Sequence, residues 1–94
     1  MDDTQALLSV DARLDNWASA ARGRYDAADA ARVEQAWQRL SPRHQDLLRM
    51  AYQWRAGREV ICRRLNIPRY PWRRYELELA SAKRALDGQL ATMR

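Results

Sequence analysis

Hydrophobic side chains recur at alternating steps of three and four along much of the chain, the spacing that places them on one face of an α-helix. The first such stripe consists of Leu7, Val10, Leu14, Trp17 and Ala21. Asp2, Asp3 or Thr4 is suited to cap the start of this helix, and Gly23 is suited to end it. The pattern therefore predicts an N-terminal helix with one apolar face.

A second stripe predicts a helix that begins near Asp26 or Asp29, either of which can accept a hydrogen bond from the first backbone N–H groups. This helix is expected to run to Leu40. Its inner face carries Ala30, Val33, Trp37 and Leu40. Trp17, Trp37 and Trp54 are expected in the core, where they tie the N-terminal helices to the rest of the chain. An exposed Trp among them would instead indicate a surface for a partner.

Ser41 and Pro42 predict the start of a third helix, because Ser caps a helix and Pro needs no N–H at the first position. Its buried residues are expected to be Leu47, Leu48, Ala51 and Trp54. Gly57 is expected to close the following turn and to cap a fourth helix over 58–65. The inner face of that helix is expected to carry Val60, Ile61 and Leu65, with the small Cys62 where two helices approach closely.

Asn66 is expected to end the fourth helix, because Asn tolerates the left-handed conformation found at helix ends. Pro68 and Pro71 frame a turn, and Pro71 is well placed to open the last helix. That helix is long and carries one apolar face, formed by Tyr75, Leu79, Ala82, Leu86, Leu90 and Met93.

Composition agrees with a helical protein. Val and Ile are scarce, Gly and Pro number three each, and helix-forming residues dominate. We predict an all-α fold of about five helices in a single domain over 1–94, with N-terminal helices in 1–40 packed on a module in 41–94. Cys62 is the only cysteine, so an internal disulfide is excluded. With no signal-like start and no apolar run of ~20 residues, a cytoplasmic location is expected and no membrane partner.

Charge divides the chain into two unequal halves. Residues 1–40 hold five Arg against seven acidic residues, a net charge of −2, whereas residues 41–94 hold twelve basic and five acidic residues, a net charge of +7. Between Arg43 and Tyr75, nine Arg stand against only Asp46 and Glu59. An asymmetric basic half is typical of nucleic-acid binders. A solvated arginine-rich face would give the same count, so the interpretation depends on the local motif.

The segment from Leu40 to Ile67 has the pattern of a helix-turn-helix, which presents a further helix to a DNA groove. Its residues resemble the C-terminal region of bacterial sigma factors, the part that binds the promoter −35 element. In that family a Leu-x-Pro-Arg helix ends in Tyr, and a helix of the type Glu-x-Ile-Ala-x-x-Leu-Gly-Ile follows a turn. The residues that match the first helix are Leu40, Pro42, Arg43, Leu47, Leu48 and Tyr52. Those that match the second are Glu59, Ile61, Cys62 in place of Ala, Leu65, Asn66 in place of Gly, and Ile67.

The long last helix corresponds to the family's recognition helix, whose core residues follow at steps of four, three and four. Tyr75, Leu79, Ala82 and Leu86 keep these steps. Tyr75 lies eight residues after Ile67, so the turn is about three residues longer than the family pattern. The resemblance covers residues 40–90, over half of the chain.

The chain is too short for a sigma factor and lacks the regions of that family that bind the −10 element. Small proteins that join such a module to N-terminal helices are similar to phage late-gene regulators, with the Q-type antitermination proteins as the nearest group. The segment RLDNWASAARGRY and the Val-Glu-x-Ala-Trp helix after it resemble the N-terminal part of those proteins. The resemblance implies a sequence-specific double-stranded DNA-binding transcription regulator of phage or prophage type, with RNA polymerase or sigma factor as its protein partner.

Residues at the start of a recognition helix point into the major groove. The candidates for contacts with base edges are Arg69, Tyr70, Trp72, Arg73 and Arg74. Arg suits this role because its planar fork can bond both acceptors of guanine. Glu76 fits either a contact with cytosine or a role in holding an Arg, Tyr75 is expected in the core, and Trp72 fits the core or a base stack. The candidates for phosphate contacts are Arg43, Arg58, Arg63 and Arg64.

Two alternatives remain open beside the transcription regulator. One is a helix-turn-helix module that binds sigma factor or RNA polymerase without binding DNA. The other is a phage small terminase subunit, which should assemble into rings. No enzymatic activity and no cofactor are expected, since His44 has no nucleophile at a plausible spacing. One His and one Cys do not make a tetrahedral metal site, and no Gly-rich phosphate loop is present.

Overall fold

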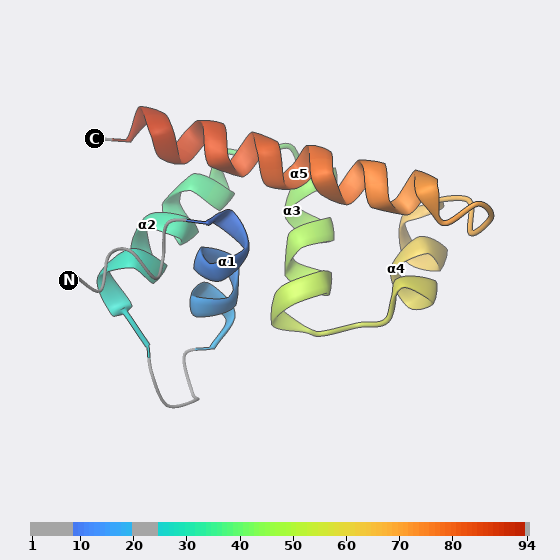
Figure 1. Ribbon diagram of the computed structural model, residues 1–94, viewed down its shortest axis with the longest axis horizontal. Coiled ribbons are helices and arrows are strands. Elements are labelled where there is room, and N and C mark those ends of the chain that lie inside the picture. Colours follow the sequence, from blue (N-terminus) through green and yellow to red (C-terminus); the bar gives the residue numbers. More distant parts are fainter. Residues whose placement is uncertain (1–8, 20–24, 94) are drawn as a thin grey trace.

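The computed structural model describes residues 9–19 and 25–93, and all regular structure in these residues is helical (Figure 1). The elements in chain order are α1 (Val10–Ala18), α2 (Ala27–Gln38), α3 (Pro42–Leu48), the π-helix η2 (Arg49–Gln53), α4 (Arg58–Leu65) and α5 (Arg73–Thr92). The prediction of an all-α fold with about five helices is confirmed. The long α5 runs along the whole molecule, with α1 and α2 near its C-terminal half, α3 in the middle and α4 at its N-terminal end.

Helix α1 begins later than the sequence pattern predicted. Its N-cap is Ser9, whose hydroxyl accepts a hydrogen bond from Ala12 N at 3.0 Å. The expected start near residues 2–4 is therefore wrong, because an extended Ser9 already supplies the cap. The other residues expected at the ends of this helix lie outside the described residues; they are Asp2, Asp3, Thr4, Leu7, Ala21 and Gly23.

Three further helix starts agree with the sequence. The last helix does not open at Pro71 as predicted, because α5 begins at Arg73 with Trp72 as its N-cap. Asp26 caps α2 by accepting from Asp29 N at 3.1 Å, and Ser41 caps α3 by accepting from His44 N at 3.4 Å. Gly57 is the N-cap of α4, and Asn66 ends that helix in the left-handed conformation at φ 58°. These local sequence signals therefore place three of the helix starts and one helix end.

The third helix changes its winding after Leu48. Residues 49–53 form a π-helix, in which Trp54 N donates to Arg49 O at 3.0 Å. Because a π-turn holds more residues than an α-turn, the faces of the helix shift along this segment. Met50 is buried and Trp54 is 57% exposed. The prediction that Trp54 lies in the core is wrong, since it assumed an uninterrupted α-helical period.

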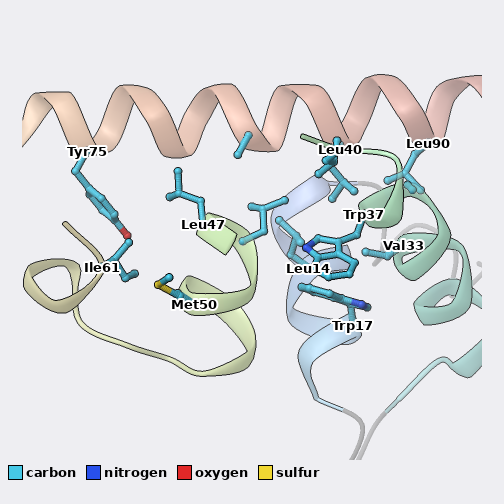
Figure 2. Packing of buried hydrophobic residues seen from close by; sticks show 14 of the residues in the cluster. Leu14, Trp17, Val33, Trp37, Leu40, Leu47, Met50, Ile61, Tyr75 and Leu90 are labelled. Atoms are coloured by element: carbon cyan, nitrogen blue, oxygen red, sulfur yellow. The ribbon is translucent and has the colours of Figure 1, made fainter. Parts of the chain in front are cut away.

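One hydrophobic cluster joins the N-terminal helices to the rest of the protein. The rings of Trp17 and Trp37 lie 5.9 Å apart in its centre (Figure 2), which confirms both as core residues. Their indole N–H groups are satisfied: Trp17 donates to Glu34 Oε1 at 2.8 Å and Trp37 donates to Gln45 O at 3.0 Å. The second bond links α2 to α3, so the aromatic pair fixes how the N-terminal helices sit on the module.

The inner face of α5 is the one that the sequence predicted. Tyr75, Ala82, Leu86 and Leu90 are buried, and Leu79 and Met93 pack against the cluster. Tyr75 reaches from α5 toward Ile61 of α4 (Figure 2). On α4, Ile61 and Cys62 are buried and Leu65 is half-buried, but Val60 is 42% exposed. The prediction for Val60 is wrong because α4 turns Cys62 fully inward and Val60 therefore outward.

Two sets of polar contacts join α1 to other helices. Arg13 of α1 bonds Asp29 of α2, with Nη2 and Oδ1 at 2.7 Å. Asp11 Oδ1 accepts from Lys83 Nζ at 2.9 Å and from the Tyr52 hydroxyl at 3.0 Å, which ties α1 to α5 and η2. The Lys83 bond lowers the pKa of Asp11, and the same bond raises the pKa of Lys83. Burial raises the pKa of Tyr52.

Candidate nucleic-acid interface

Helix α4 and the start of α5 lie at the same end of the molecule, far from α2 (Figure 1). Six exposed arginines on α4, on the turn after it and at the start of α5 define what we call the arginine-rich end: Arg58, Arg63, Arg64, Arg69, Arg73 and Arg74. Glu59 is the only acidic residue between positions 55 and 74. The structure thus brings most of the predicted DNA-binding arginines together at one end.

Most of these guanidinium groups are available to a ligand. Among the described residues, no acidic side chain forms an ion pair with Arg58, Arg63, Arg64, Arg73 or Arg74. Arg69 lies 3.6 Å from Glu59, from Nη1 to Oε2, and both side chains are at least half exposed. A solvent-exposed pair of this kind is weak, so Arg69 can exchange Glu59 for a phosphate at little cost.

The turn between α4 and α5 is held by an aromatic and cationic stack. The guanidinium carbon of Arg58 lies 4.1 Å from the ring centroid of Trp72, and the rings of Tyr70 and Trp72 are 5.8 Å apart at 51°. Trp72 is half-buried and packs against the core, whereas Tyr70 is 77% exposed. Trp72 therefore anchors the turn, and Tyr70 is the part of the stack that faces solvent.

The connection from Leu65 to Arg73 is longer than the turn of three or four residues found in helix-turn-helix motifs. This agrees with the longer turn that the sequence indicated. The backbone of this turn begins at Asn66 and includes both Pro68 and Pro71. A shallow depression lies beside it, lined by Cys62, Arg63, Asn66, Ile67, Pro68 and Arg69.

The side chain of Arg43 is hydrogen-bonded to other residues of the protein. Its Nε donates to Glu78 Oε1 at 2.9 Å, its Nη2 to Glu78 Oε2 at 3.2 Å and its Nη1 to Leu65 O at 2.9 Å. The sequence placed Arg43 among the phosphate contacts, but all three guanidinium nitrogens hold α3, α4 and α5 together. The hydrogen bonds with Glu78 raise the pKa of Arg43, and the same bonds lower the pKa of Glu78.

Cys62 is not accessible to a substrate. It lies on the inner side of α4 with 1% of its surface exposed, as the sequence predicted. Burial raises the pKa of its thiol, which keeps it protonated and poorly nucleophilic. Among residues 9–19 and 25–93, no group of three His, Cys, Asp or Glu side chains is arranged to hold a metal ion. No described helix combines the length and apolarity needed to cross a membrane.

Arg55 and Trp54 are surface residues that the sequence analysis did not include in the candidate site. Arg55 adopts the left-handed conformation at φ 52°, which non-glycine residues rarely take. It directly follows Trp54, the C-cap of the π-helix, and precedes Ala56, whose N donates to Met50 O at 2.9 Å. Backbone strain of this kind often accompanies a functional surface. No signal in the sequence marks this position, since Arg rarely adopts the left-handed conformation.

Comparisons with known proteins return no match to a family model, to a curated protein or to a solved structure. The resemblance to the sigma-factor region therefore depends on the residue pattern alone.

Proposed function

We propose that this protein binds double-stranded DNA through the arginine-rich end and regulates transcription together with RNA polymerase, as Q-type antitermination proteins do. The observation that carries the DNA-binding part is the clustering of exposed arginines on α4 and at the start of α5, nearly free of acidic partners. A cluster of this kind attracts phosphates and gains affinity by releasing the counterions of DNA. The transcriptional part is supported by the sequence resemblance.

The side chains divide between two roles. Arg73 and Arg74 open α5, and with Arg69 and Tyr70 they form the set proposed to contact bases. Trp72, which the sequence analysis placed in the same set, is half-buried under Arg58 and supports the turn. Arg63 and Arg64 are exposed in the last turn of α4 and are proposed to contact phosphates. Arg58 is exposed too, but its guanidinium already lies over Trp72, so its main role in the proposal is to support the turn.

Salt dependence tests the proposal directly. DNA affinity of the wild-type protein should fall steeply with salt, with about 0.9 of log–log slope for each phosphate neutralised. The Arg63→Ala/Arg64→Ala double variant should weaken binding to all sequences and flatten that slope by up to about 1.8. The matched control is Arg32→Ala/Arg39→Ala, which removes the same charge from two exposed positions of the N-terminal half. Equal effects of the two double variants would show that net charge acts, and not the arginine-rich end.

A protein-interaction function is the second candidate, and Trp54 is the observation that favours it. An exposed Trp in the turn after η2 loses the stabilisation of burial, and Trp is enriched where proteins bind one another. Trp54→Ala should weaken binding to purified RNA polymerase or sigma factor in a titration that leaves DNA out. If the protein shows no salt-dependent DNA affinity while Trp54→Ala abolishes polymerase binding, the second candidate replaces the first.

A further inference from the structure

Tyr70 is the most exposed large side chain with hydrophobic character among those that the structure describes. Its ring contacts the ring of Trp72, and the guanidinium of Arg58 lies over the Trp72 ring. An aromatic ring left in water lacks the favourable free energy that burial of its apolar surface would give. A ligand that packs on this exposed ring would therefore gain binding free energy by removing it from water.

The stack is held in place before any ligand binds. Trp72 packs against the hydrophobic cluster, and Arg58 is fixed in the first turn of α4. Pro71 follows Tyr70 directly, and proline restricts both its own backbone and that of the residue before it. Tyr70 thus loses little conformational freedom when a ligand stacks on it, which favours affinity.

The charge around Tyr70 indicates the chemistry of that ligand. Arg69 precedes it, and Arg73 and Arg74 follow within four residues, all exposed. Aromatic rings placed among arginines are typical of proteins that bind single-stranded nucleic acid, where rings stack on bases and arginines contact the backbone. A paired base offers only its edge in a groove, so its flat face is accessible only when the base is unpaired.

We propose that Tyr70, supported by Trp72 and Arg58, is a stacking platform for an unpaired nucleobase. The preferred ligand is then a DNA duplex with a short unpaired segment next to the part that the arginine-rich end binds. This inference rests on the proposed function, because it requires the arginines to hold the neighbouring phosphates.

The test compares two ligands of identical sequence, a perfect duplex and the same duplex with a short mismatched bubble that carries 2-aminopurine. The wild-type protein should bind the bubble about 5- to 150-fold more tightly, the range that stacking of one base gives. Tyr70→Ala should abolish this ratio and the quenching of 2-aminopurine, whereas Tyr70→Phe should retain both. The ratio of bubble affinity to duplex affinity is measured because a variant that weakens binding to both ligands equally leaves this ratio unchanged. Tyr25→Ala, which removes another exposed Tyr, should leave the ratio unchanged, and circular dichroism checks the fold of each variant.

The possible failures can be told apart. A wild-type protein that binds duplex and bubble equally, with steep salt dependence, overturns the platform and leaves the proposed function standing. A bubble preference that survives in Tyr70→Ala assigns the stacking to another residue and also overturns the inference. If neither ligand is bound with salt-dependent affinity, the proposed function fails as well, and the exposed Tyr70 is then to be assigned to a protein contact.

Discussion

The guanidinium of Arg43 and the carboxylate of Glu78 form a bidentate ion pair, with Nε 2.9 Å from Oε1 and Nη2 3.2 Å from Oε2. The remaining terminal nitrogen of Arg43 donates to Leu65 O, the last residue of α4. One side chain of α3 therefore holds both α4 and α5. Because the arginine-rich end is built from those two helices, Arg43 fixes the geometry of the candidate interface without belonging to its surface.

Removal of Arg43 should loosen the fold. We expect Arg43→Ala to lower the free energy of unfolding by about 1 kcal/mol, a modest value because the side chain is nearly half exposed and solvent screens the pair. Arg43→Lys should recover only part of the loss, since an ammonium group does not reproduce the planar fork. Urea titration measures both variants. An Arg43→Ala protein of unchanged stability and weaker DNA binding would restore Arg43 to the phosphate contacts.

Two carboxylates should make the protein sensitive to acid. The Lys83 bond holds the pKa of Asp11 below its ordinary 3.8, and the Arg43 bond holds the pKa of Glu78 below its ordinary 4.5. Each group binds protons more readily in the unfolded chain, so its stabilising contribution is present above these ordinary values and is lost as the pH falls through the lower folded-state values. We expect the urea midpoint to decrease as the pH falls below about 4.5.

Variants of the two carboxylates separate this effect from general acid unfolding. Asp11→Asn and Glu78→Gln should each be less stable at neutral pH and should show a weaker decrease of the urea midpoint in acid. Asp46→Asn is the matched control, because Asp46 is exposed and its side chain bonds no described residue. If all three variants follow the wild-type pH profile, the pairs with Lys83 and Arg43 do not control acid stability.

Much of the fold could be predicted because its signals are local. Ser41, Pro42, Gly57 and Asn66 mark helix ends through backbone chemistry that depends on no distant contact. The errors arose where the winding or rotation of a helix changed. The π-helix over Arg49–Gln53 shifts the register, so Met50 is buried and Trp54 is exposed, and no sequence period indicates such a shift.

The candidate site was predictable as a set of residues but not in its internal contacts. Clustered arginines reveal a basic surface, and the structure places them at one end of the molecule. Which arginine is already engaged depends on partners far away in the sequence. Arg43 and Glu78 are 35 positions apart, and the stack of Arg58 on Trp72 needs the turn to fold back onto α4.

Arg55 should lower the stability of the fold through its backbone conformation and contribute to DNA binding through its side chain. In the left-handed conformation a non-glycine residue costs about 1 kcal/mol more than Gly, so Arg55→Gly should raise the free energy of unfolding by about that amount. If the exposed side chain meets a phosphate, the same variant should flatten the salt dependence of DNA binding. Arg55→Ala is the control, because it removes the charge but keeps the strain. A less stable Arg55→Gly protein would mean that the arginine side chain itself supports the fold.

Cys62 should react slowly with a thiol reagent in the native protein and rapidly after denaturation, because it is buried and burial raises its thiol pKa. Cys62→Ala should be tolerated, since the helix crossing needs a small side chain more than sulfur. Cys62→Leu should overpack the contact and cost about 1–3 kcal/mol in urea titration. Fast labelling of the native protein would contradict the position of α4 against the core.

Arg73 and Arg74 stand at adjacent positions of α5, which point about 100° apart. Tyr75, Ala82 and Leu86 define the inner face of the helix. Arg73 lies roughly opposite that face, one turn before the exposed Leu77. Arg74 lies on the side of the helix, one turn before Glu78. It is close enough to Glu78 to lower the pKa of that carboxyl. A helix that enters a groove with its outer face first therefore presents Arg73 to the bases and Arg74 to the backbone.

The two arginines should consequently give different mutant profiles. Arg73→Ala should lose about 1–3 kcal/mol of binding free energy on a site selected from random sequences, and little on unselected DNA. Arg74→Ala should weaken both ligands alike and reduce the salt slope by about 0.9. Fluorescence anisotropy with both ligands measures these changes, and Tyr75→Ala shows by contrast the effect of a core truncation, which destabilises the fold itself. If both arginine variants keep the wild-type fold and DNA affinity, α5 does not enter a groove, and the protein-interaction function centred on Trp54 becomes the better account.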